Sequence, residues 1–108
     1  MRLYTSESQT AKLIELGFEK PKMAAPALKW VDGEPTFEPQ YTIGELIEML
    51  PVNASERIRF VAIKRAWIVD TDVLGKSGVG KCYRGTYHPR LIDALYEMVV
   101  KLKEEGVI

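Results

Sequence analysis

The segment with the clearest chemical signature is residues 75–82, GKSGVGKC. It matches the Gly-x4-Gly-Lys pattern of a phosphate-binding loop, in which backbone N–H groups and the lysine hold the phosphates. The next position should carry a Ser or Thr hydroxyl as a Mg²⁺ ligand, but it is Cys82, and a thiol is a poor ligand for this hard cation. Residues 83–87 are strand-like, whereas such a loop must open onto a helix. We therefore interpret Gly75–Lys81 as a hairpin connection, with phosphate or nucleotide binding as the remote alternative.

Few other side chains could take part in catalysis. His88 is the only histidine and Cys82 the only cysteine. A cysteine nucleophile needs a nearby base and a lowered pKa, and the strand-like segment between these two residues places them on the same side at best. We expect His88 to be a helix-start residue and Cys82 to be a small buried one.

Two carboxylates are spaced so that they would share one face of a strand. Asp70 and Asp72 could together bind a metal or take part in acid–base chemistry. The next acidic residue is Asp93, however, so we expect them to form a solvated strand end. The sequence thus predicts no catalytic residue, no bound cofactor and no metal site, and a protein that is not an enzyme.

Positive charge is concentrated in residues 57–90, although the chain has a formal net charge of zero. This segment holds eight Lys or Arg and two Asp, whereas residues 1–56 hold five basic and nine acidic residues. Basic side chains interleaved with aromatic rings can follow a phosphate backbone while the rings stack on bases. A solvated sheet face has the same composition, and zero net charge is unusual for a nucleic-acid-binding protein. Nucleic-acid binding is therefore the alternative hypothesis, and its candidate residues are Arg57, Arg59, Arg65, Lys81, Tyr83 and Arg84.

The length and composition are those of one globular domain spanning residues 1–108, with 46% hydrophobic and 28% charged residues. A lone cysteine makes no intramolecular disulfide. The first residues lack the apolar core of a signal peptide, and no run approaches 18 apolar residues. We therefore expect a cytoplasmic protein that makes no contact with a membrane.

Three helices are predicted from the residues at their ends. The first two begin with capping boxes, Ser-x-x-Gln and Thr-x-x-Glu, and the third follows His88-Pro89. Glycines at the C-terminal ends of the first and third helices supply the left-handed residue that stops a helix. The predicted helices run from Ser6 to Gly17, from Thr42 to Leu50 and from Pro89 to Gly106.

Two β-hairpins are predicted between the helices. The first joins residues 28–31 to residues 34–37 through Asp32-Gly33, a strong hairpin signal. The second joins a strand over residues 57–69 to a strand over residues 81–87, with a bulge or a slip of register left open at residues 64–66. The predicted fold is therefore α+β, with three helices packed on an antiparallel sheet of two hairpins in the order α-ββ-α-ββ-α.

Several short runs resemble a known group of proteins. They are TSESQ at residues 5–9, KLIELGF at 12–18, YTIGEL at 41–46 and Leu50-Pro51. Together they resemble small proteins encoded by phages and mobile elements of gut bacteria, and the resemblance covers most of the chain. That family has no assigned activity and no established functional residues, so it implies no site here. It favours our leading hypothesis of a small non-enzymatic interaction protein, with self-association or a protein partner bound through the sheet or a sheet edge.

Overall fold

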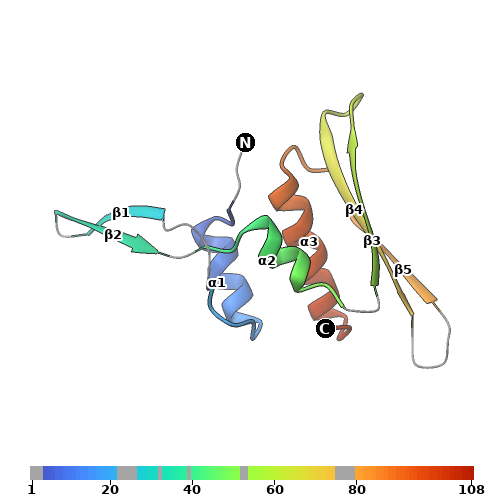
Figure 1. The fold of residues 1–108 in the computed structure, drawn as a ribbon, viewed down its shortest axis with the longest axis horizontal. Coiled ribbons are helices and arrows are strands. Elements are labelled where there is room, and N and C mark those ends of the chain that lie inside the picture. The colour runs from blue at the N-terminus through green and yellow to red at the C-terminus, as the bar shows by residue number, and fades with distance from the viewer. Residues whose placement is uncertain (1–3, 22–26, 32, 39, 52–53, 75–79) are drawn as a thin grey trace.

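The computed structural model describes residues 4–21, 27–31, 33–38, 40–51, 54–74 and 80–108, which form helices and antiparallel strands (Figure 1). The predicted α+β class is confirmed. The order is α-ββ-α-βββ-α, one strand more than predicted. The elements are α1 (Glu7–Glu15), β1 (Ala27–Val31), β2 (Glu34–Glu38), α2 (Ile43–Glu48), β3 (Ala54–Val61), β4 (Ala66–Leu74), β5 (Gly80–Arg84) and α3 (Leu91–Glu104).

The ends of α1 and α2 follow the local chemistry of the sequence. The Ser6 hydroxyl accepts from the Gln9 N–H at 3.1 Å, and the Gln9 side chain accepts from the Ser6 N–H at 2.9 Å. The same reciprocal pair opens α2 at Thr42. Helix α1 is terminated by Gly17, which follows the C-cap and whose φ of 102° is in the left-handed region. Both predicted capping boxes are therefore confirmed.

The start of α3 differs from the prediction by two residues. His88 does not cap the helix, because its backbone N–H and C=O pair with Trp67 of β4 at 2.8 and 2.6 Å. This pairing makes His88 part of the sheet, and the helix begins only at Leu91 with Arg90 as its N-cap. The helix-start interpretation of His88 is therefore wrong.

The second predicted hairpin is a three-stranded antiparallel sheet in the order β3-β4-β5. Residues 62–65 form a turn in which the N–H groups of Lys64 and Arg65 donate to Val61 and Ala62 at 3.1 Å. The Arg65 φ of 48° is left-handed. The prediction of one continuous strand over residues 57–69 is therefore wrong, because the chain reverses at residues 62–65 and continues as a separate strand, β4. Gly80 and Lys81 begin β5, so a strand and no helix follows the glycine-rich segment, whose residues 75–79 lie outside the described residues.

The arrangement of the layers differs from the predicted one, in which three helices pack on a single sheet. Figure 1 shows α3 against the three-stranded sheet, with α2 and α1 on the other side of α3. The buried core joins these layers, and its largest aliphatic side chains are Leu13, Leu46, Leu50, Val69, Ile92, Leu95, Met98, Val99 and Leu102. No helix in the described part of the chain is long and apolar enough to cross a membrane.

Strands β1 and β2 form a separate two-stranded sheet, which we call the β-arm. Its antiparallel register pairs Ala27 with Glu38 and Val31 with Glu34. Figure 1 shows the β-arm extending away from the helices and from the other sheet. The radius of gyration is accordingly 15.3 Å, whereas a compact chain of this length has a radius of about 13 Å.

Candidate functional site

A cluster of polar side chains fastens the segment before α3 to the helix itself. Glu97, on the second turn of α3, accepts hydrogen bonds from the Thr86 N–H at 2.6 Å, the Thr86 hydroxyl at 2.5 Å and His88 Nε2 at 2.9 Å. Glu97 and His88 are each somewhat less than one-third exposed. We call these three residues the Glu97 cluster.

Gly85 makes the Glu97 cluster possible. Its N–H donates to the Val69 carbonyl at 3.0 Å, after the regular β4–β5 ladder has ended at Arg84. A Cβ atom at Gly85 would lie 2.5 Å from that carbonyl oxygen and 3.1 Å from Glu97 Oε1. The register passes from Asp70↔Arg84 to Trp67↔His88, so one extra residue is inserted here. The insertion turns His88 toward α3.

The geometry of the cluster does not activate the threonine hydroxyl. In a hydroxyl–histidine–carboxylate relay, the hydroxyl contacts one ring nitrogen and the carboxylate the other. Here Thr86 Oγ1 and Glu97 Oε2 both contact His88 Nε2, at 3.1 and 2.9 Å. Burial by itself raises the pKa of Glu97, but hydrogen bonds from Thr86 and His88 outweigh burial and hold this pKa below its ordinary value. The carboxylate is thus a weak base that positions the chain.

The lowered pKa of Glu97 predicts an acid-dependent contribution to stability. The pKa of Glu97 is lower in the folded chain than in the unfolded chain, where it has its ordinary value of 4.5. The stabilisation is therefore fully present above pH 4.5, and it is lost as the pH falls through the pKa of the folded chain. Urea unfolding from pH 7 to pH 3 should show wild type losing more stability than Glu97→Gln over this range. Equal losses in the two proteins would contradict the role given to Glu97.

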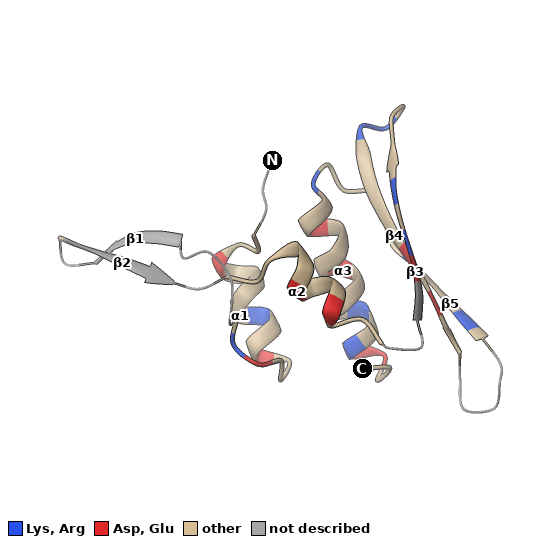
Figure 2. Cartoon of the chain, viewed as in Figure 1, with Lys and Arg blue, Asp and Glu red and all other residues tan. Residues whose placement is uncertain are grey.

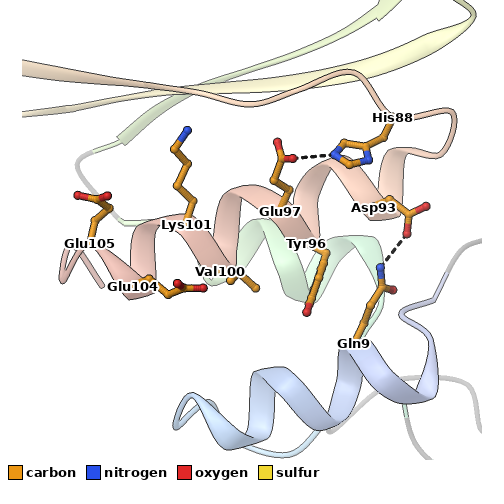
Figure 3. Close-up of a pocket in the computed structure, with 9 residues that line it drawn as sticks. All are labelled: Gln9, His88, Asp93, Tyr96, Glu97, Val100, Lys101, Glu104 and Glu105. Atoms are coloured by element: carbon orange, nitrogen blue, oxygen red, sulfur yellow. Dashed lines mark hydrogen bonds and ion pairs between the residues drawn. The ribbon is translucent and has the colours of Figure 1, made fainter.

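Beside the cluster, α3 forms one wall of an open hollow of about 550 Å³. One row of α3 residues at i, i+4 spacing consists of Asp93, Glu97, Lys101 and Glu105, and the next consists of Tyr96, Val100 and Glu104. Figure 3 shows Tyr96 and Val100 on the side of α3 nearer α1. At one end Gln9 of α1 donates to Asp93 at 2.8 Å and joins the two helices. We call this the α3 hollow.

The charge of the α3 hollow is mostly negative. Four carboxylates line it, against one lysine and one histidine. Lys101 Nζ donates to the Arg84 carbonyl oxygen at 2.7 Å, and His88 contacts Glu97. Burial, and then the charge of Glu104, raise the pKa of Tyr96, so the phenol stays neutral. Small ligands commonly bind hollows of this size, about 300–1,000 Å³, with mixed apolar and polar linings.

The candidate nucleic-acid-binding residues are divided between the two faces of the three-stranded sheet. Arg57 and Arg59 lie on the face away from α3 and form ion pairs with Asp72 at 2.9 Å and Asp70 at 3.2 Å. Arg84 is opposite Asp70 on the same face. These pairs neutralise part of the positive charge that the sequence concentrates here, and Figure 2 shows the acidic positions of β4 among the basic ones.

The other candidates lie elsewhere. Tyr83 faces the core and is only 7% exposed, so its ring does not present a free face to a base. Lys81 Nζ lies 5.1 Å from the centre of that ring. Arg65 is in the turn after β3 and lies outside the strand that holds Arg57 and Arg59. The structure therefore does not bring the six candidates together, and nucleic-acid binding stays a prediction.

Two expectations about residues on the sheet face that carries Arg57 and Arg84 are wrong. Asp70 is only 5% exposed, so it is not part of a solvated strand end, and its Oδ1 has no hydrogen-bond partner. Cys82 is exposed and not buried. Its hydrogen bond to Asp72 is the largest of the effects that raise the pKa of the thiol, so Cys82 is not an activated nucleophile. Among the described residues, no three potential ligands lie close enough together to hold a metal ion.

Neither the Glu97 cluster nor the α3 hollow is predicted from the sequence, because both depend on contacts between distant parts of the chain. The Gln9–Asp93 contact joins residues 84 positions apart, and the path of the chain through Gly85 decides where His88 points. The one available signal was the row of charged residues at four-residue spacing along α3. From the sequence, that helix is predicted only by the residues at its two ends.

Comparison of the sequence with protein-family models gives no match, and neither curated proteins nor solved structures give one.

Proposed function

We propose that this protein is a small non-enzymatic interaction protein that self-associates through its β-arm. The observation that carries the proposal is the isolation of the two strands. In the described part of the chain, no helix or strand lies over the β-arm (Figure 1). An isolated two-stranded hairpin is at best marginally stable in water, whereas three or more strands form a stable sheet. A second copy of the chain would supply the missing strands.

The two edges of the β-arm are not equivalent. Pro35 of β2 lacks a backbone N–H, and proline in a sheet is restricted to edge strands and bulges. Strand β1 contains no proline, so its free edge can pair with another strand. Antiparallel pairing of β1 with β1 of a second copy gives a four-stranded sheet around a twofold axis. We infer that β1 forms the dimer interface.

Removal of the β-arm tests this function. Ala27 and Glu38 are paired neighbours, so two glycines can replace residues 27–38 without pulling the flanking chain apart. We expect wild type to sediment at twice the chain mass of 12.2 kDa and the variant to sediment as a monomer. The melting temperature of the dilute variant should match that of dilute wild type, because the core lies outside the β-arm.

Two results would count against this proposal. A wild-type chain that stays monomeric from micromolar to submillimolar concentration would exclude self-association. A variant that remains dimeric would move the interface from the β-arm to the three-stranded sheet.

A further inference from the structure

The α3 hollow combines an apolar floor with a negative border. Tyr96 and Val100 are half-buried and pack against the core, so they form a fixed surface. Carboxylates lie around this surface, with Asp93 at one end and Glu104 and Glu105 at the other (Figure 3). A ligand that fits this lining has an alkyl or aryl part and a positive charge.

Glu104 and Glu105 are at an unfavourable place for negative charge. They are the last residue and the C-cap of α3, where the helix dipole disfavours carboxylates. The two lysines of that turn are directed elsewhere. Lys101 bonds to the Arg84 carbonyl, and Lys103 Nζ lies 5.4 Å from the centre of the Phe18 ring. Within the described residues, neither glutamate forms a salt bridge, so the fold does not pair these two negative charges.

We propose that the α3 hollow binds an arginine or lysine side chain presented by an extended basic segment of a partner protein. Long basic side chains lay their alkyl stems along apolar surface and keep the charged group at the edge. Here the stem would lie on Val100, the cation would reach Glu104, and the Tyr96 ring would add a cation–π contact. The site is separate from the β-arm, so failure of one proposal leaves the other standing.

The probe is a capped hexapeptide of alternating arginine and leucine, added to the full-length ¹⁵N-labelled protein at low salt. The matched control is the same peptide with citrulline in place of arginine, which keeps the shape of the side chain and removes its charge. Agmatine, the arginine side chain as a free molecule, is the third ligand. We expect the arginine peptide to shift the amide signals of Tyr96, Val100 and Glu104, and to bind at least tenfold more tightly than the other two ligands.

The double variant Glu104→Gln/Glu105→Gln tests the site itself. It should weaken binding of the arginine peptide by about twofold to twenty-five-fold, since each of two exposed ion pairs contributes about 1.4-fold to fivefold. It should not destabilise the fold, because removing negative charge at the end of a helix is favourable. The matched control is Glu15→Gln/Glu48→Gln, which removes two exposed charges from α1 and α2, outside the hollow, and should change affinity less than twofold.

Each of the remaining outcomes overturns the inference. Equal binding of the citrulline peptide would show that charge is not recognised. Equal weakening by the control variant would show only long-range attraction. Binding of agmatine as tight as that of the peptide would identify the ligand as a small free cation and not a partner segment.

Discussion

Replacement of Leu95 by alanine is expected to lower the free energy of unfolding by about 2–5 kcal/mol, the usual cost of truncating a buried leucine. Leu95 lies in the middle of α3 and is completely buried. Because α3 lies between the three-stranded sheet and α2, the cavity left by the substitution would open at the junction of both layers. Little of it can be filled by movement of one neighbour. Urea unfolding followed by circular dichroism measures the change.

Ile63→Ala is the control for this substitution. Ile63 is 97% exposed in the turn between β3 and β4, so its truncation should change the free energy of unfolding by less than about 0.5 kcal/mol. A similar loss at both positions would mean that the substitutions act on the unfolded chain. A loss near zero at Leu95 would show that α3 is not the centre of the core.

The features predicted correctly from the sequence are those that depend on a few neighbouring residues. The capping boxes at Ser6 and Thr42 bring together groups three positions apart, and Gly17 ends a helix through its own φ. The α+β class followed from the residues that begin and end the helices and from the turn and strand signals between them. Such signals do not need the rest of the fold.

The features predicted wrongly depend on pairing between distant parts of the chain. The turn at residues 62–65 contains neither glycine nor proline, and Arg65 adopts a positive φ that its residue type does not indicate. His88 carries a helix-start signal with Pro89, but its backbone N–H and C=O both pair with Trp67, so this residue belongs to the sheet. In both places the sheet register overrides the local preference.

The candidate site was missed for the same reason. The residues of the Glu97 cluster are ordinary in sequence, and they meet because an inserted residue at Gly85 changes which side of the strand faces α3. Asp70 looked like a solvated residue, yet its position on the central strand buries it under Arg59. Neither outcome follows from residue type or spacing alone.

Gly85→Ala is expected to destabilise the protein by about 3 kcal/mol, near the upper end of the usual cost of overpacking. The added methyl would lie 2.5 Å from the Val69 carbonyl oxygen, which is backbone and has no rotamer to adopt. It would also lie 3.1 Å from Glu97 Oε1 and push the carboxylate away from Thr86. The acid-dependent stability assigned to Glu97 should therefore shrink together with the total stability, and urea unfolding at pH 7 and pH 3 measures both.

Gly80→Ala is the matched control, because it makes the same change at the start of β5. A Cβ there meets the Val73 carbonyl oxygen at 3.9 Å, an ordinary contact, and the φ of Gly80 is not left-handed. Alanine in place of glycine at a compatible position stabilises a protein by about 0.4–1 kcal/mol, mainly by restricting the unfolded chain. The two substitutions should therefore change stability in opposite directions. If Gly85→Ala were as well tolerated as Gly80→Ala, the inserted residue would not be held against Val69, and the position of His88 beside Glu97 would need another cause.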